Sequence, residues 1–417
     1  MDKLDGGTCE GTISMIVWNE FVNDARVLKE AQTLQRAGYL VIVHALHTPG
    51  VTKEKETLNG GIKIVRVARS PFWKLRKSGK SGKALGSGWQ AKSSGSIKSM
   101  SVKTQVLRIA ARLWTHTVLL YHLVRSRPDI VHAHDVNTLP TAWIASVMAG
   151  VPLVYDAHEI STGREGYSGF RSLVGWVEKR LMPRAVATIT TTDARAKFFA
   201  RAYDIFRPIV LQNRPRYLRG TRSNRLREEL DLQEDWPIVI YQGGLQQGRG
   251  LERLVSMAQT VAGAYFVFIG GGRLEGLLKA HAAQLGLLNQ KVFFIPTVSL
   301  ADLPKYTASA DIGVQPIENT CLNHFTTDSN KLFEYVIAGL SLVTSDLPEI
   351  RKVVRENDLG LLVPPGDSRA LTLALQTLVD DAQLRERYRK ASLAAAKELN
   401  WEQQEHKLTE LYAKIMR

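Results

Sequence analysis

The sequence contains little cysteine and no long apolar run. Cys9 and Cys321 are the two cysteines among 417 residues, and they lie far apart without a Cys-x-x-Cys spacing. Neither a disulfide framework nor a zinc site is therefore expected, which fits a reducing cytosol. Apolar stretches such as AWIASVMAGVPLVY are interrupted by Gly and Pro and are too short to span a bilayer. MDKLDGGTCEGT, at the start, lacks the apolar core of a signal peptide, so we expect a cytoplasmic protein that is soluble or peripheral to the plasma membrane.

Acidic residues are missing from one region. Between Thr57 and Pro128 there are fifteen Lys and Arg and no Asp or Glu, while the other 40 basic residues balance the 40 acidic ones. The net charge of +15 therefore lies in this region. Its basic insertion, 69–100, also holds Phe72, Trp73 and Trp89, a mixture that suits an anionic membrane surface. A solvated Ser/Gly-rich loop is the alternative, and nucleic acid is not expected because no nucleic-acid-binding module accompanies the charge.

Short apolar segments alternate with helical patterns along the chain. ISMIVW, DIVHAH and PLVYDAH in the first half, and PIVIYQGG, YFVFIGGG and LSLVTS in the second, are typical of buried parallel strands. Helices are expected to begin near Asp24, Thr138 and Asp193, and a longer one to cover roughly Val102 to Val124. The alternation predicts an α/β fold with two doubly wound Rossmann-like domains facing across a cleft, with ligands at the carboxyl ends of the strands.

A basic, proline-containing stretch near Asn213 separates the two halves. We therefore expect an N-terminal domain at 1–212 and a C-terminal domain at 213–397. The last segment, 398–417, reads as a helix.

Two glycine-rich turns follow strands of the second half. Gly243 and Gly244 precede Arg249, and a second turn contains Gly270 and Gly272. Such turns let backbone N–H groups approach an anion, and the arginine fork suits a diphosphate. Tight turns need glycine in any case, so one turn is weak evidence, but two in one domain favour a nucleotide.

The segment NKLFEYVIAG predicts a helix that Gly339 ends. Lys331, Glu334, Tyr335 and Ala338 share one face at 100° per residue, and apolar residues fill the other. The lysine and glutamate are either a surface ion pair worth a few tenths of a kcal/mol or part of a ligand site.

Several longer segments of the sequence together resemble a known protein family. GGLQQGRGLE, FIGGG, SNKLFEYVIAGLSLVTSDLPEI and GLLVPPGD in the second half, with NDARVLKEAQTLQRAGYLVIVHA, DIVHAHDVNTLPTAWIAS and PLVYDAHEIS in the first, resemble the family 4 glycosyltransferases with the GT-B fold. Bacterial members that build cell-surface polysaccharides look most similar. The resemblance implies a retaining transfer from a UDP- or GDP-linked sugar to a glycan or lipid-linked acceptor, without a metal or other cofactor. It also implies that 398–417 crosses back to the N-terminal domain.

Particular residues acquire roles from the resemblance. Glu334 would hold the ribose hydroxyls, Asn330 and Lys331 would meet the diphosphate, and His134 would touch the donor sugar near the reacting carbon. Backbone groups at Thr297 and Val298 would contact the base. The residues implied in catalysis are His134, Arg249, Lys331 and Glu334. The implied donor-binding residues are Arg249, Lys331 and Glu334 together with Gly243, Gly244, Gly270, Gly272, Thr297, Val298 and Asn330.

The acceptor-side candidates are Asp24, Arg26, Asp135 and Glu159. Asp24 could equally be an N-cap, and Glu159, like its neighbour His158, could equally be structural.

Two positions depart from the family pattern. Thr326 stands where the first of two paired glutamates is usual, and Asp328 or Glu318 could replace it. Gly244 stands where an arginine is frequent. A nucleoside diphosphate sugar 2-epimerase on the same fold, or a non-catalytic nucleotide-sugar or polyanion binder, are the alternative functions.

Overall fold

The computed structural model describes residues 10–69, 102–163, 169–219 and 222–417, and these form two compact units. The first unit contains the described residues up to Gln212 together with Glu405–Arg417, and the second is Asn213–Gln404. All but the first residue of the predicted basic insertion, 69–100, lies outside the described residues. Among those that are described, no helix is both long and apolar enough to cross a membrane.

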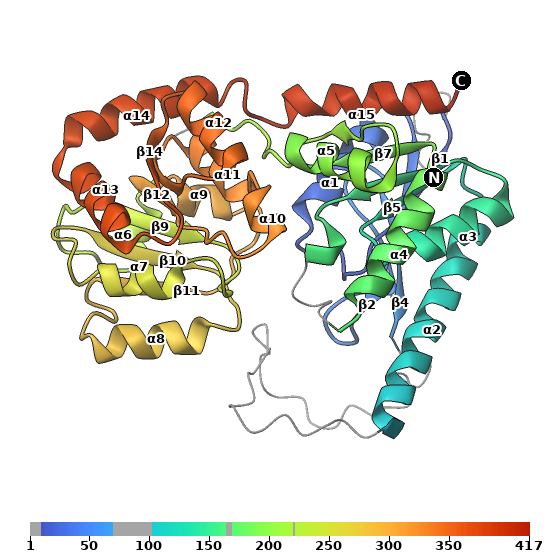
Figure 1. Ribbon diagram of the computed structural model, residues 1–417, viewed down its shortest axis with the longest axis horizontal. Helices are drawn as coiled ribbons and strands as arrows, with labels where there is room; N and C mark the ends of the chain where they lie inside the picture. Colours follow the sequence, from blue (N-terminus) through green and yellow to red (C-terminus); the bar gives the residue numbers. More distant parts are fainter. Residues whose placement is uncertain (1–9, 70–101, 164–168, 220–221) are drawn as a thin grey trace. The chain divides into compact units, whose positions relative to one another are not determined.

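The first unit is built on an eight-stranded sheet in the order β3-β4-β2-β1-β5-β6-β7-β8 (Figure 1). Neighbouring strands are parallel except β3 and β4. The order reverses between β1 and β5, so their carboxyl ends form the crevice where ligands bind in such sheets. The strands are β1 (Thr12–Ile16), β2 (Leu40–His47), β3 (Lys55–Thr57), β4 (Lys63–Ala68), β5 (Ile130–His134), β6 (Leu153–Ala157), β7 (Ala187–Thr190) and β8 (Ile209–Val210).

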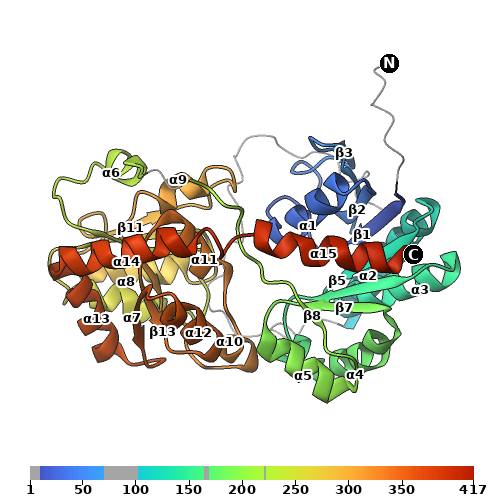
Figure 2. The same ribbon diagram turned by 90° about the horizontal axis from the view of Figure 1, so that it is seen from above.

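Helices cover both faces of this sheet. The expected helix starts are confirmed: Asp24 and Thr138 are the N-cap residues of α1 and α3, and α5 begins at Asp193. One apolar core lies between the sheet and α2, α3 and α5. The C-terminal helix α15 lies along α1, where Thr33 Oγ1 donates to Glu405 Oε2 at 2.9 Å (Figure 2). The helices are α1 (Ala25–Arg36), α2 (Val102–Arg125), α3 (Leu139–Ala149), α4 (Arg171–Leu181), α5 (Asp193–Tyr203) and α15 (Glu402–Ile415).

The second unit holds a six-stranded parallel sheet in the order β11-β10-β9-β12-β13-β14. Apolar cores on its two faces confirm a doubly wound domain, with the reversal between β9 and β12. The strands are β9 (Ile238–Gln242), β10 (Tyr265–Ile269), β11 (Val292–Ile295), β12 (Ile312–Gln315), β13 (Ser341–Ser345) and β14 (Gly360–Val363). The helices are α6 (Arg225–Glu229), α7 (Leu251–Met257), α8 (Glu275–Gln284), α9 (Leu303–Thr307), α10 (Leu322–Phe325), α11 (Asn330–Ala338), α12 (Pro348–Glu356), α13 (Ser368–Asp380) and α14 (Ala382–Ala395).

The helix that was predicted to have one polar and one apolar face is α11, and it forms as predicted with one correction. It ends at Gly339, whose φ of 73° is left-handed, and its apolar face is buried. Tyr335, which the pattern puts on the polar face, is fully buried. Its ring packs over Gly313, where a side-chain Cβ would lie 2.5 Å from Tyr335 Cδ2. The tyrosine therefore belongs to the core.

Candidate active site

Glu334 is held in place at the carboxyl end of β9. Gln242, the last residue of that strand, donates from Nε2 to Glu334 Oε2 at 2.5 Å and accepts from Thr307 Oγ1 at 2.7 Å. Its backbone N–H donates to the hydroxyl of Tyr335 at 3.1 Å. The sequence analysis did not predict Gln242 as a site residue, although a polar residue that ends an apolar strand just before a glycine turn indicates one. The bonds fix the orientation of the glutamate at the switch point of the second sheet.

Lys331 lies beside a second cation. Its Nζ is 5.6 Å from the centre of the Tyr241 ring. The side chain of Lys331 passes closely over Gly243, where an added Cβ would lie 2.3 Å from Lys331 Cε. Burial and the charge of Arg249 lower the pKa of Lys331 to about 8, against the opposite effect of Glu334. Within the described part of the chain neither Lys331 nor Arg249 forms an ion pair, and the opposing charge that acts on Lys331 is that of Glu334.

The two glycine turns pack directly against one another. A Cβ at Gly270, whose φ is 132°, would lie 2.3 Å from the carbonyl oxygen of Gly243, and one at Gly272 would lie 2.2 Å from that of Leu245. The N–H groups of Gly243 and Gly270 donate to carbonyls at the ends of β10 and β11 at 2.8 and 2.9 Å. These two N–H groups are therefore used inside the protein, and the turns require both the small size of glycine and, at Gly243 and Gly270, its positive φ.

The other predicted donor residues lie at loops on this edge. Gly244 is exposed after β9, Thr297 is exposed and Val298 half-buried after β11, and Asn330 begins α11. Ser329, the residue before Asn330, has a positive φ of 33°, which strains a residue that carries a side chain.

The position of the missing glutamate is occupied by a buried threonine. Thr326 Oγ1 donates to the carbonyl of Leu322 at 2.8 Å. Glu318, one suggested replacement, pairs with Arg253 at 3.2 Å, and Asp328, the other, is buried. The structure therefore gives Thr326 a helix-capping bond rather than a carboxylate-like role.

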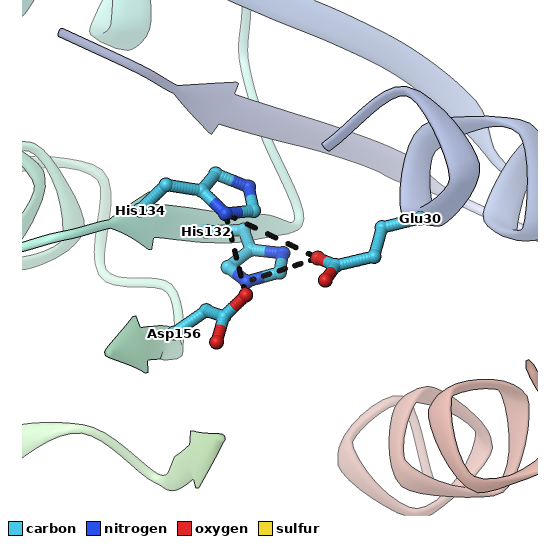
Figure 3. A group of neighbouring side chains, drawn as sticks. All are labelled: Glu30, His132, His134 and Asp156. Atoms are coloured by element: carbon cyan, nitrogen blue, oxygen red, sulfur yellow. Dashed lines mark ion pairs between the residues drawn. The ribbon is translucent and has the colours of Figure 1, made fainter. Parts of the chain in front are cut away.

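In the first unit, Glu30, His132, His134 and Asp156 gather at the carboxyl ends of β5 and β6 (Figure 3). All four are buried. Arg26 lies among them: its Nε is 2.8 Å from Asp156 Oδ2 and 3.1 Å from Glu30 Oε1, and its Nη2 is 2.9 Å from Asp156 Oδ1. The sequence prediction missed Glu30, His132 and Asp156.

These four side chains offer donor atoms that a metal ion could use, all within 4.8 Å of one another. The guanidinium of Arg26 already binds both carboxylates, so a divalent cation would meet a fixed positive charge there. Burial and the charge of Asp156 raise the pKa of Glu30 well above its ordinary value. Burial alone would raise the pKa of Asp156, but Arg26 and His158 lower it well below its ordinary value. The pKa values of the two carboxyl groups around the arginine are therefore shifted in opposite directions.

Two histidines share the carboxylate of Asp156. His158 Nε2 is 3.1 Å from Asp156 Oδ2 and 3.3 Å from His134 Nδ1. Burial alone would lower the pKa of His158, but Asp156 and Asp135 raise it to about 9, whereas burial lowers the pKa of His134. His134 Nδ1 faces both His158 Nε2 and Asp156 Oδ2, and the other ring nitrogen of His134 is Nε2. That buried atom has no hydrogen-bond partner among the described residues.

The predicted acceptor-side residues differ in exposure. Asp24 caps α1, accepting from the N–H of Val27 at 3.2 Å and from Asn19 at 2.8 Å. Arg26 is buried and bonded as described. Asp135, with a positive φ of 62°, is one-fifth exposed, and Glu159 is half-buried. Asp24, like Asp135 and Glu159, is half-buried, so Arg26 is the one of the four that is fully enclosed.

Both halves of the chain match family models of known proteins. A family model described as "Glycosyl transferases group 1" matches residues 222–394, and one described as "Glycosyl transferase 4-like domain" matches 24–211. A phosphatidyl-myo-inositol mannosyltransferase of Mycobacterium leprae is 26% identical over 69% of this chain and 73% of its own length. A D-inositol 3-phosphate glycosyltransferase of Xylanimonas cellulosilytica is 23% identical over 93% of this chain and 90% of its own.

Solved structures show the same fold. Sucrose-phosphate synthase of Thermosynechococcus elongatus has a TM-score of 0.73 at 16% identity, with 97% of this chain and 99% of that one covered. HepE of Anabaena, solved in complex with UDP-glucose, has a TM-score of 0.71 at 16% identity, with 97% and 100% covered.

Proposed function

Because the chain belongs to the family 4 glycosyltransferases with the GT-B fold, we propose that it transfers a sugar from a UDP- or GDP-linked donor to an acceptor hydroxyl with retention of anomeric configuration. Family membership carries the reaction class. The donor class is supported by HepE, a structural neighbour that binds UDP-glucose.

The paired cations of the second unit are the observation that carries the donor site. Lys331 and Arg249 repel each other in a partly buried place, and a diphosphate would neutralise both. The first turn of α11 adds the positive end of a helix dipole. Glu334, fixed by Gln242, presents a carboxylate that accepts from vicinal ribose hydroxyls. The same cations would oppose the charge that develops on the leaving nucleoside diphosphate, so they stabilise the transition state.

For the transfer step we assign no protein nucleophile. The acceptor oxygen forms its bond to the anomeric carbon on the face from which the phosphate oxygen leaves, and the acceptor proton passes to that phosphate oxygen. His134 donates from Nε2 to a hydroxyl of the transferred sugar, which gives a partner to a buried N–H that otherwise costs about 1–3 kcal/mol. Protonated His158 and Asp156 position that imidazole.

A lipid-linked or polysaccharide acceptor at the cytoplasmic membrane face is proposed for the other substrate. Two features support it: the basic region 57–128, and the relative named for transfer to phosphatidyl-myo-inositol. Asp135 and Glu159 are the proposed acceptor contacts.

Product analysis tests this function. The full chain is incubated with UDP-glucose, UDP-N-acetylglucosamine or GDP-mannose and a membrane extract, and products are followed by NMR. Acceptor-dependent release of nucleoside diphosphate with an unchanged anomeric configuration is expected. Glu334→Gln should lower kcat/KM by roughly 10- to 100-fold, because one charged hydrogen-bond acceptor is lost. The matched control, Glu356→Gln on the exposed side of α12, should change little. Interconversion of the donor sugar without an acceptor would contradict the proposal.

A further inference from the structure

Three helices form one outer surface on the first unit. The core of this face lies between the sheet and α2 and α3, and α3 packs against both α2 and α4 (Figure 1). The sides of the three helices that point away from the sheet are therefore neighbours. This set of outer sides is called the α2–α4 face below.

The α2–α4 face is apolar over much of its area. On α2, the described residues from Gln105 to Ala110 are exposed on every side of the helix. On α3 and α4 the exposed apolar residues recur at helical spacing, so each helix presents an apolar stripe to the outside. These residues are Val106, Leu107, Ile109, Leu113, Trp114 and Tyr121 on α2; Ile144, Val147 and Met148 on α3; and Leu173 and Trp176 on α4, preceded by Phe170.

The charges on this face have one sign. The sole acidic residue within α2, α3 and α4 is Glu178, which is fully buried and accepts from the hydroxyls of Tyr155, Ser161 and Tyr203. Arginines instead stack on the aromatic rings: Arg180 lies 5.9 Å from the ring of Trp176, and Arg125 lies 6.0 Å from that of Tyr121. Further exposed basic residues are Arg108, Arg112, Arg171 and Lys179.

The face also adjoins the carboxyl edge of the first sheet. His116 of α2 stacks on Trp18, which follows β1, with ring centres 4.3 Å apart. Arg112 donates to Asn137, which follows β5, at 2.7 Å. The exposed half of α2 therefore begins next to the loops that carry the proposed acceptor residues.

From this arrangement we infer that the α2–α4 face docks on an anionic lipid bilayer. Exposed aliphatic and aromatic side chains enter the headgroup boundary, and arginines contact acidic headgroups. The exposed apolar stripes distinguish this surface from a nucleic-acid site, which needs cations and base-stacking aromatics rather than aliphatic residues. The inference deepens the proposed function, because it rests on a membrane-bound acceptor and places the edge near Asn137 at the lipid surface.

Vesicle sedimentation of the full chain tests the docking, without donor or acceptor present. Vesicles of phosphatidylcholine with phosphatidylglycerol should carry down the protein, and pure phosphatidylcholine should carry down much less. Arg108→Gln with Arg180→Gln should weaken binding about fivefold for each charge removed at low salt. Leu113→Gln with Met148→Gln should weaken it at least tenfold, with less sensitivity to salt.

Matched controls lie on the second unit, where Leu277, Leu373, Lys352 and Arg355 are exposed. Leu277→Gln with Leu373→Gln, and Lys352→Gln with Arg355→Gln, should sediment like the unaltered protein. Equal loss in the controls, unaltered binding in both α2–α4 pairs, or binding of RNA in place of vesicles would overturn the docking. Because nucleotide binding is measured separately on the second unit, failure here leaves the glycosyltransferase proposal standing, and the reverse also holds.

Discussion

Lys331 is a cation in surroundings that disfavour its charge. Burial and Arg249 lower its pKa to about 8, so it is charged at pH 7 and loses its proton as pH rises through 8. A bound diphosphate favours the charged form. The dissociation constant of the preferred nucleotide should therefore stay level from pH 7 to 8 and then rise by up to about tenfold per pH unit. Calorimetric titration between pH 7 and 9.5 measures this.

Lys331→Arg is the control for this titration. A guanidinium stays charged from pH 7 to 9.5, so the dissociation constant of the nucleotide should not change with pH in this variant, even if its affinity is lower. A level profile in the unaltered protein would show that Lys331 does not contact the diphosphate.

His158 should make the stability of the first unit depend on pH. Its pKa is raised from 6.5 to about 9, so its stabilising contribution is complete below pH 6.5 and disappears as pH rises through 9. His158→Gln should cost on the order of 2–3 kcal/mol at pH 6 and little at pH 9.5. Hydrogen exchange of the amides of β5 and β6 reports this free energy, and an equal cost at both pH values would refute the assignment.

The placement of single residues was predictable where it depends on a local motif. Lys331, Glu334 and Arg249 stand beside turns and helix starts that the sequence marks, and the structure brings them to one edge of the second sheet. Arg26 and Asp156 are paired across 130 residues, and nothing in either local segment indicates the other. Such long-range buried pairs depend on the order of the strands, which the sequence pattern does not reveal.

At the scale of elements, the turn after β9 has to leave room for the lysine of α11. Gly243→Ala would place a Cβ 2.3 Å from Lys331 Cε at a φ of 116°. We expect a loss of about 1–3 kcal/mol of stability from the strained backbone and a large loss of nucleotide affinity from the displaced lysine. Thermal unfolding and calorimetry measure the two effects.

Gly276→Ala provides the matched control. Gly276 lies in α8, where an added Cβ meets no atom within 4 Å. The change should stabilise the protein by roughly 0.5–1 kcal/mol and leave nucleotide binding unaltered. Normal affinity in Gly243→Ala would contradict the close passage of Lys331.

Helix boundaries followed from the sequence more closely than side-chain burial did. The pattern from Val102 to Val124 corresponds to α2, Val102–Arg125, because caps and apolar periodicity are local signals. Tyr335 was misplaced because the glycine on β12 that admits its ring is distant in sequence. The exposed apolar turns of α2 were not predicted either, since periodicity does not say which apolar residues find a partner.

For the whole molecule, activity should be independent of divalent metal ions. The cluster of possible metal ligands in the first unit already holds Arg26 between its carboxyl groups. The proposed diphosphate partners are Lys331 and Arg249 of the second unit. Excess EDTA should leave turnover unchanged. Loss of turnover that Mg²⁺ or Mn²⁺ restores would contradict this expectation.

Two α/β domains were predictable because strands and helices alternate through nearly the whole sequence, and the units divide between Gln212 and Asn213 near the basic, proline-containing stretch. A second division follows Gln404, inside the start of α15, where no change in composition marks it. Donor base, sugar and acceptor depend on side chains that the family pattern does not fix.

Nucleotide-induced stabilisation tests the central claim most directly, namely that α11 carries the donor site. UDP or GDP at about 100 times its dissociation constant should add roughly 2.7 kcal/mol to the unit that binds it. We predict that one of them raises the melting temperature of the full chain and that Glu334→Ala abolishes the rise, which also identifies the base. No shift with either nucleotide at saturating concentration, or an undiminished shift in Glu334→Ala, would contradict the claim.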